Sequence, residues 1–367
     1  MQEGRSKYPF ENVATPIRED QLVIAPSLQV GAFDSHAVDC PFVFSKDGRQ
    51  GMTYIGWDGV GYQTALTWND GNDNWSPGTL IFRRDPNNEL RKYNAALTSI
   101  VRDNDINSLG ELILINGWYY GTFHAYPSPG YEAGAGAIGF VKSRDLLNWV
   151  EVGSTLRAEE GMPWEQGGLY KSWLLHHDGL FYLYYNAKNL DVFGSTQVPP
   201  PWIEQTGLAT SPDLVHWQRY AGNPILAAGG PGEFDEVFAS DPCVLRDGVD
   251  WIMFYFGLAA DGHAREGFAT SRDLIYWGKS GRVLLDVGPP GSIDSIHTHK
   301  PAVISRHDRL EHYYCAVAPV AGIDVAGYTQ RELRGIARAS SAARHSSSNR
   351  LERAAPRIFP TLPTSRS

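Results

Sequence analysis

The sequence lacks any long hydrophobic run, and no stretch approaches the roughly 18 apolar residues that a membrane-spanning helix needs. Segment 1–20 is polar and holds no apolar core, so we expect no secretory signal and a cytoplasmic location. Basic residues are in the minority, with 32 Lys and Arg against 41 Asp and Glu and a formal net charge of −9. Because nucleic acids bind basic surfaces, we expect neither a nucleic acid nor a membrane as partner.

Cysteine is also scarce, with Cys40, Cys243 and Cys315 as the complete set. An odd number of cysteines gives no disulfide framework, and the absence of a C-x-x-C spacing gives no zinc signature. All three lie in apolar, strand-like runs. We therefore expect buried thiols in a reducing compartment.

Turn-forming residues, in contrast, are abundant, with 38 Gly and 23 Pro. Between them a motif recurs that reads S-x-D-L-x-x-W and occupies 143–149, 211–217 and 271–277, with a degenerate copy that ends at Trp75. Repetition at near-even spacing indicates one supersecondary unit that is used several times. We expect each copy to be a strand end closed by a Ser/Asp turn, with Leu and Trp packing that turn on the next strand.

Apolar and aromatic runs precede the motifs in pairs, as expected for two strands joined by a tight turn. Asp-Gly turns at 47–48, 178–179 and 247–248 join three of the pairs. Five such units without a long helical periodicity predict an all-β fold, a five-bladed β-propeller, with a β-sandwich or a mixed fold as the alternative. The five pairs lie at 39–44 with 51–57, 94–101 with 117–126, 170–175 with 179–187, 241–245 with 249–257, and 299–304 with 310–318.

The chain divides into three parts on composition. We expect an N-terminal segment at 1–29, a propeller domain at 30–337 and a low-complexity, disordered tail at 338–367, which is rich in Ser, Arg and Pro. The tail begins where the fifth copy of the motif would stand. The fifth blade therefore lacks outer strands unless the N-terminal segment supplies one.

Candidate functional residues lie at the start of each first strand, because in a propeller this strand lines the central channel and its leading residue faces one mouth. A polar group in a narrow channel costs desolvation unless it is paired or functional. For an Asp before Pro the structural alternative is that it caps a turn. The five positions hold Asp39, Asn94, Lys171 (with Glu165 just before it), Asp241 and His299.

These motifs carry a family resemblance. The repeats, Asp39-Cys40-Pro41 and Ser240-Asp241-Pro242 resemble the clan of five-bladed propeller glycosidases that includes glycoside hydrolase family 43 and the family 117 neoagaro-oligosaccharide hydrolases, over residues 30–337. The resemblance implies that Asp39 is the general base and that Asp241 tunes the acid and orients substrate. The slot of the acid reads His299-Lys300-Pro301 instead of the usual Glu, so the proton donor is His299 or, alternatively, Glu236 or Glu165.

Further polar and aromatic residues are candidates for substrate contacts. His297 and His299 share a face of one strand, but no third ligand is evident, so we expect no catalytic metal and no cofactor, while a structural divalent cation in the channel stays open. The candidate substrate-binding residues are Trp57, Asn94, His124, Lys171, His263, Arg265, His297 and Lys300.

The sequence thus predicts a glycoside hydrolase that cleaves a terminal glycosidic bond of an oligosaccharide with inversion, using Asp39 as base and His299 as acid. One alternative is a glycoside phosphorylase, because Lys171, Arg265, His299 and Lys300 could hold phosphate. A second is a carbohydrate-binding propeller without catalysis. The sugar, the linkage and the oligomeric state are left open.

Overall fold

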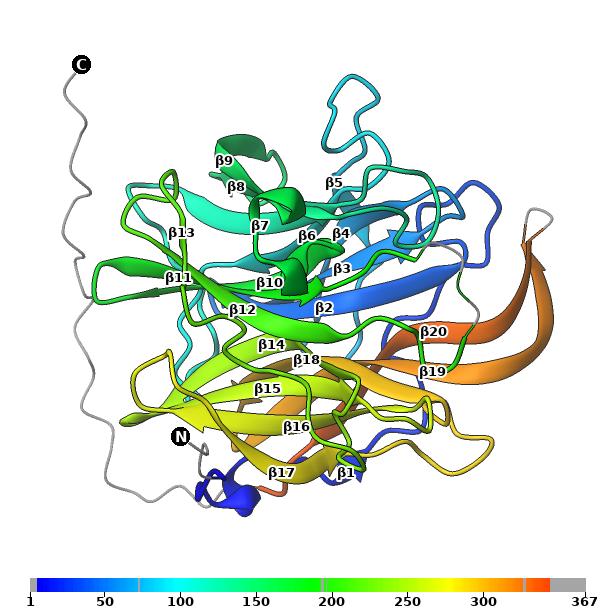
Figure 1. Ribbon diagram of the computed structural model, residues 1–367. Helices are drawn as coiled ribbons and strands as arrows, with labels where there is room; N and C mark the ends of the chain where they lie inside the picture. The colour runs from blue at the N-terminus through cyan, green and yellow to red at the C-terminus, as the bar shows by residue number, and fades with distance from the viewer. Residues whose placement is uncertain (1–4, 72, 193–194, 196, 326–327, 344–367) are drawn as a thin grey trace.

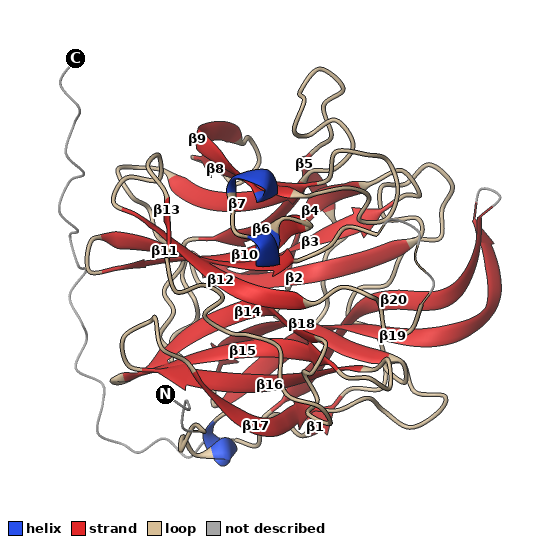
Figure 2. Cartoon of the chain, in the orientation of Figure 1, coloured by secondary structure: helices blue, strands red, loops and turns tan. Residues whose placement is uncertain are grey.

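The computed structural model describes residues 5–71, 73–192, 195, 197–325 and 328–343. Strands dominate these residues, as Figure 2 shows, and the helices in them are single 3-10 turns, η1 (Phe10–Asn12), η2 (Ala158–Glu160) and η3 (Pro163–Glu165). The predicted all-β class is therefore confirmed. In this described part no helix has the length and apolar character needed to cross a membrane.

By antiparallel pairing, the strands of the described residues fall into five groups, of which the last three are joined into one 12-stranded sheet by single parallel pairs, β12 with β14 and β16 with β18 (Figure 1). The predicted strand pairs are found as the first two strands of these groups. The first three groups are β2 (Ala37–Lys46), β3 (Arg49–Trp57), β4 (Tyr62–Trp68) and β5 (Thr79–Phe82); β6 (Ala96–Ile100), β7 (Tyr119–Ala125), β8 (Ala137–Ser143) and β9 (Val150–Arg157); and β10 (Gly168–His177), β11 (Leu180–Lys188), β12 (Glu204–Ser211) and β13 (Gln218–Arg219).

The fourth and fifth groups complete the arrangement. They are β14 (Phe238–Asp247), β15 (Asp250–Leu258), β16 (Ala264–Ser271) and β17 (Gly278–Leu285); and β18 (His297–Arg306), β19 (Arg309–Val325), β20 (Tyr328–Ser340) and β1 (Ile17–Arg18). β1 pairs antiparallel with β20, so the N-terminal segment supplies the outer strand of the last group. Each first strand lies against the first strand of the next group, and β18 returns to β2.

The S-x-D-L-x-x-W motifs form the turns that follow the third strands. In the copy at 271–277, the Ser271 hydroxyl accepts the backbone N–H groups of Asp273 and Leu274, and the indole of Trp277 donates to the Leu274 carbonyl. Leu274 has a left-handed backbone with φ +68°, and the same conformation recurs in the other two copies. A left-handed Leu is uncommon, so the Ser, Asp and Trp contacts stabilise a turn that Leu alone would disfavour.

A register shift interrupts the pairing of each of the five first strands with its second strand. In three of them the bulged residue has a positive φ and precedes a proline, namely Cys40, Asp241 and Lys300. Proline fits here because a bulge leaves a backbone N–H out of the ladder. A bulge also re-aims side chains, and the residues at these positions line a cavity inside the ring of first strands.

One buried arginine joins three first strands inside the ring. The Arg102 guanidinium donates to the carbonyls of Val43 in β2 and Val303 in β18. It also lies over the rings of Phe42 and Trp173, at 5.6 and 5.0 Å from their centroids. Trp173 is therefore a buried structural residue.

The predicted domain boundaries shift at both ends. Ile17 and Arg18 belong to the sheet through β1, so the N-terminal segment 1–29 supplies an outer strand, the possibility that the sequence left open. Arg338 to Ser340 are the last residues of β20, so the expected tail begins after the strand. Residues 344–367 of that tail lie outside the described residues.

Candidate active site

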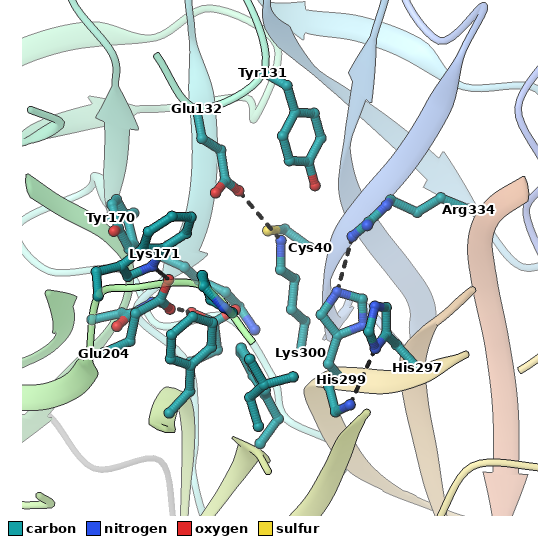
Figure 3. A pocket seen from close by; sticks show the side chains of 18 of the residues that line it. Cys40, Tyr131, Glu132, Tyr170, Lys171, Glu204, His297, His299, Lys300 and Arg334 are labelled. Atoms are coloured by element: carbon teal, nitrogen blue, oxygen red, sulfur yellow. Dashed lines mark hydrogen bonds and ion pairs between the residues drawn. The ribbon is translucent and has the colours of Figure 1, made fainter. Parts of the chain in front are cut away.

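A cavity of about 240 Å³ opens among the starts of the first strands. All five groups contribute to its wall, through Cys40, His124, Lys171, Asp241 and Lys300 among others. Two long connections also reach it, one between β7 and β8 and one between β11 and β12. Figure 3 shows acidic and basic side chains from these elements pointing into one space.

Glu204 is the carboxyl group whose chemistry stands out in this cavity. It opens β12, is 6% exposed, and accepts hydrogen bonds from the Trp202 indole at 3.0 Å and the Asn186 amide at 3.0 Å. Burial, together with the charge of Glu132, raises the pKa of Glu204 to about 7. A carboxyl group with this pKa carries its proton below neutral pH and can donate it to a leaving oxygen.

Asp241 stands beside Glu204. The amide nitrogen of Asn186 donates to both carboxyl groups, at 3.0 Å to Glu204 and at 3.1 Å to Asp241. Burial also raises the pKa of Asp241, although the nearby charges of Lys171 and Lys300 oppose that effect. The shared amide places Asp241 and Glu204 on the same side of the cavity.

Glu132 faces the cavity from a different element, the connection between β7 and β8. Its carboxylate lies 3.9 Å from the ammonium group of Lys300 (Figure 3). Figure 3 also shows it pointing into the space beside Glu204. Three carboxyl groups thus line the cavity, Glu204 and Asp241 on one side and Glu132 on a separate connection. Sequence reasoning had named neither Glu204 nor Glu132.

Asp39, the expected base, lies just outside the cavity wall. It is buried, 2.8 Å from the ammonium group of Lys300 and 3.4 Å from the guanidinium of Arg334. Burial alone would raise the pKa of Asp39, but the charges of Lys300 and Arg334 hold it well below its usual range. A carboxylate held ionised by two cations is a weak proton acceptor, so the geometry argues against a general base here.

His299, the expected acid, lines the cavity in a form that cannot donate toward it. Its Nδ1 donates to the Cys315 carbonyl at 3.0 Å, and its Nε2 faces an N–H donor of Arg334 at 3.0 Å. Burial and the charge of Arg334 lower the pKa of His299 well below its usual value. The ring is therefore neutral, and its Nε2 accepts a hydrogen bond rather than giving a proton.

The two alternative acids do not line the cavity. Glu165 is buried outside it, where it accepts hydrogen bonds from the Tyr185 hydroxyl at 2.8 Å and from Arg219 at 3.1 Å. Glu236 binds the backbone N–H groups of Gly232 and Ala260, each at 2.6 Å. Both carboxylates hold loops in place, which leaves Glu204 as the acid that the geometry favours.

The predicted substrate-binding residues fall into two sets. Four of them line the cavity, namely His124, Lys171, His297 and Lys300. The other four lie outside its wall: Asn94 binds the backbone of Tyr62 and Tyr126, Trp57 packs edge-on against Tyr131, His263 donates to the Ile296 carbonyl, and Arg265 pairs with Asp261 and Asp286.

The basic residues of the cavity differ in charge. Burial and the charge of Lys300 lower the pKa of His124 to about 3, and burial and Arg334 lower that of His297 to about 4, so both rings are neutral. Lys171 is 3% exposed, and its ammonium group has no hydrogen-bond partner among the described residues. Its charge is free to hold a polar group of a ligand.

One trio of side chains has the donor types of a metal site. Within the described residues, ligand atoms of Asp39, His299 and Cys315 lie within 4.8 Å of one another. Lys300 and Arg334 already neutralise Asp39, and burial raises the pKa of the Cys315 thiol well above its usual value. Because a bound cation needs a free carboxylate and a thiolate, these residues fit a divalent metal poorly. We therefore assign no step to a metal.

Known proteins share this architecture. The structure of a BT0996 complex with RGII superposes with a TM-score of 0.73 at 25% identity, covering 97% of this protein and 97% of that one. A glycoside hydrolase superposes with a TM-score of 0.72 at 23% identity, covering 98% of this protein and 99% of that one. A member of the GH130 family of mannoside phosphorylases and glycoside hydrolases superposes at 0.57 and 16% identity, covering 92% and 93%.

Two curated relatives match over shorter stretches. A 1,2-beta-oligomannan phosphorylase of Thermoanaerobacter sp. (strain X514) is 28% identical over 123 residues, which cover 33% of this chain and 40% of that protein. An uncharacterized protein of Mycobacterium tuberculosis (strain CDC 1551 / Oshkosh) is 29% identical over 140 residues, which cover 36% and 43%. The matches thus span less than half of the length of these relatives.

The fold, which matches propeller-type glycoside hydrolase structures, and the acid-lined cavity define a carbohydrate-active enzyme. Residues 102–289, just over half of the chain, match the family model of the glycosyl hydrolases family 32 N-terminal domain, and the chain belongs to that family. The expected glycoside hydrolase resemblance is therefore confirmed. The finer likeness to family 43 remains a prediction.

Proposed function

We propose that this protein is a glycosidase that hydrolyses the terminal glycosidic bond of an oligosaccharide, with Glu204 as the general acid. The observation that carries the proposal is the Glu204 carboxyl group, buried in the cavity with a pKa raised to about 7. A structural relative that is seen as a complex with RGII supports an oligosaccharide as partner. We further infer that the five strand groups are the blades of a five-bladed propeller, because their first strands contact one another in a ring.

Glu132 is the second carboxylate of the proposed mechanism. Glycoside hydrolysis needs a proton donor at the leaving oxygen and a carboxylate on the opposite side of the sugar. Asp241 shares an amide donor with Glu204 and so lies on the acid's side, whereas Glu132 reaches the cavity from another connection. Glu132 therefore acts as base or nucleophile. Asp241 raises the pKa of the acid and binds a substrate hydroxyl.

A terminal bond suits the shape of the site. The cavity is about 240 Å³ in volume, and the connections on which Glu132 and Trp202 lie form part of its wall. A space of this size takes a sugar ring or two. A chain that ends in the cavity is cleaved at its last residue, which makes the enzyme exo-acting.

Phosphorolysis is the second candidate, because one curated relative is a 1,2-beta-oligomannan phosphorylase and the buried Lys171 ammonium group has no hydrogen-bond partner among the described residues. Of the four residues suggested for phosphate from sequence, Arg265 lies outside the cavity, His299 is neutral and Lys300 is paired with Asp39. Lys171 alone is a modest phosphate site. Hydrolysis is thus favoured.

We expect the purified protein to release a monosaccharide from one of a panel of plant, algal and fungal oligosaccharides, at a rate that inorganic phosphate does not change. Product analysis by chromatography and NMR, with and without phosphate, distinguishes a free sugar from a sugar phosphate and gives the anomer. Glu204→Gln should abolish release, while Glu159→Gln, at an exposed position, should not. A strict phosphate requirement would replace the proposal by a phosphorylase, and sugar binding without turnover by a binding module.

A further inference from the structure

We propose that Asp39, Lys300 and Arg334 form a buried ion cluster that docks the connection between β7 and β8 and thereby positions Glu132 for catalysis. The inference rests on the proposed function, in which Glu132 is the second carboxylate. It gives Asp39 and Lys300 a role as positioning residues, one contact removed from the substrate chemistry.

The ion cluster joins the first and last strand groups. Asp39 in β2 accepts from the ammonium group of Lys300 in β18 at 2.8 Å and from the guanidinium of Arg334 in β20 at 3.4 Å. All three groups are largely shielded, with side-chain exposures of 1%, 11% and 12%. Because buried charges interact strongly and an unpaired one is costly, Asp39 holds both cations in fixed positions.

Each cation of the cluster contacts one of two consecutive residues of the connection, Tyr131 and Glu132. The guanidinium of Arg334 lies 5.5 Å from the centroid of the Tyr131 ring, and the ammonium group of Lys300 lies 3.9 Å from the Glu132 carboxylate. The Tyr131 ring also packs edge-on against Trp57 and Tyr62 of the first group, at 5.6 and 5.7 Å. Tyr131 thus anchors the connection, and Glu132 beside it is directed toward the cavity (Figure 3).

The backbone of Glu132 needs such support. Its φ is +53°, a left-handed conformation that is unfavourable for a non-glycine residue and persists only where surrounding contacts enforce it. Among the described residues, the Glu132 carboxylate makes its polar contact with the Lys300 ammonium group. Losing either the pair or the Tyr131 anchor would release the carboxylate from its catalytic position. Misplacing a reacting group by about 1 Å can cost roughly 10²-fold in rate.

A double-mutant cycle on turnover tests the inference. We expect Lys300→Met to lower kcat roughly 10- to 100-fold on an activated aryl glycoside of the identified sugar, with KM changed by less than about threefold. In a Glu132→Gln background the same change should lower kcat by less than about threefold, because the carboxylate that Lys300 positions is absent. Lys188→Met, at another buried, ion-paired lysine outside the cavity wall, should show no such coupling.

A purely structural Lys300 would lower kcat equally in both backgrounds, which would overturn the inference. Tyr131→Leu is the second variant, since it leaves the ion cluster intact if Lys300→Met fails to fold. It should lower kcat in the wild-type background and not in Glu132→Gln, and equal losses in both would contradict the inference. Wild-type turnover in Glu132→Gln would instead remove Glu132 from the proposed mechanism, so the two failures are distinct.

Discussion

Glu204→Gln lowers kcat/KM by roughly 10²- to 10⁴-fold on natural oligosaccharides, the range that loss of a general acid gives. Gln keeps the shape of the side chain, but its single amide oxygen can accept from only one of the Trp202 indole and the Asn186 amide, which contact different oxygens of Glu204 at 3.0 Å each. The dependence of the loss on the leaving group, and not the loss alone, therefore reports the missing proton. Steady-state kinetics on wild type and variant give the ratio.

The leaving group provides the internal control for Glu204→Gln. A dinitrophenyl glycoside needs no proton on its departing oxygen, so the variant should cleave it at a rate within about tenfold of wild type, far above its rate on sugars. Asp241→Asn should be impaired on both kinds of substrate, because its proposed role is to bind the sugar. An equal loss on activated and natural substrates in Glu204→Gln would contradict the assignment of the acid.

Asp39→Asn lowers the free energy of unfolding by about 3–5 kcal/mol, because it removes the carboxylate that neutralises two buried cations. The Asp39 carboxylate lies 2.8 Å from the Lys300 ammonium group and 3.4 Å from the Arg334 guanidinium, and both cations would lose this partner. Denaturant unfolding should show a lower midpoint at an unchanged slope. The pKa of Asp39 is lowered in the fold, so its contribution is fully present above about pH 4 and is lost as pH falls further.

Asp47→Asn is the matched control for that change. Asp47 lies in the turn after the same strand and pairs with Lys46, but its side chain is 80% exposed. Exposed pairs contribute little, so this variant should stay within about 0.5 kcal/mol of wild type. Equal stabilities of the two variants would show that the ion cluster contributes no more than a surface pair.

Much of the fold follows from the sequence because the repeat is a local signal. The three S-x-D-L-x-x-W copies form the turns after β8, β12 and β16, and the paired runs before them are the first two strands of their groups. The sequence left open whether the N-terminal segment supplies an outer strand to the fifth group, because the pairing of β1 with β20 joins residues more than 300 positions apart. No local pattern encodes such a contact.

The candidate site was predicted less well, and the bulges explain part of the error. Counting from the start of each first strand placed Asp39 at the mouth, but the bulge turns Cys40 toward the cavity and leaves Asp39 behind it. Asp241 and Lys171, also chosen from the starts of first strands, do line the cavity. A shift of one residue along a strand moves a side chain to the opposite face of the sheet. A bulge that the sequence does not reveal therefore changes which of two adjacent residues faces the cavity.

Glu204 had a detectable signal and Glu132 had none. The position seven residues before the motif serine is occupied by Gly136, Glu204 and Ala264 in the three copies. A charged residue therefore stands in one copy where the other two copies have a small residue. Glu132 lies in an aperiodic connection, where no spacing predicts the direction of a side chain. Its position depends on the contact with Lys300 and on the packing of the adjacent Tyr131 against Arg334 and Trp57, which only the folded chain brings together.

The pH dependence of kcat/KM on a natural substrate tests the central claim most directly, because it reports the ionisation of groups in the free enzyme. Glu204 must be protonated to act as the acid, and its pKa is raised to about 7. The account predicts that kcat/KM falls about tenfold per pH unit above an apparent pKa near 7, and that Glu204→Gln lacks this alkaline limb. Activity that stays constant from pH 6 to 9, or an alkaline limb that persists in Glu204→Gln, would contradict it.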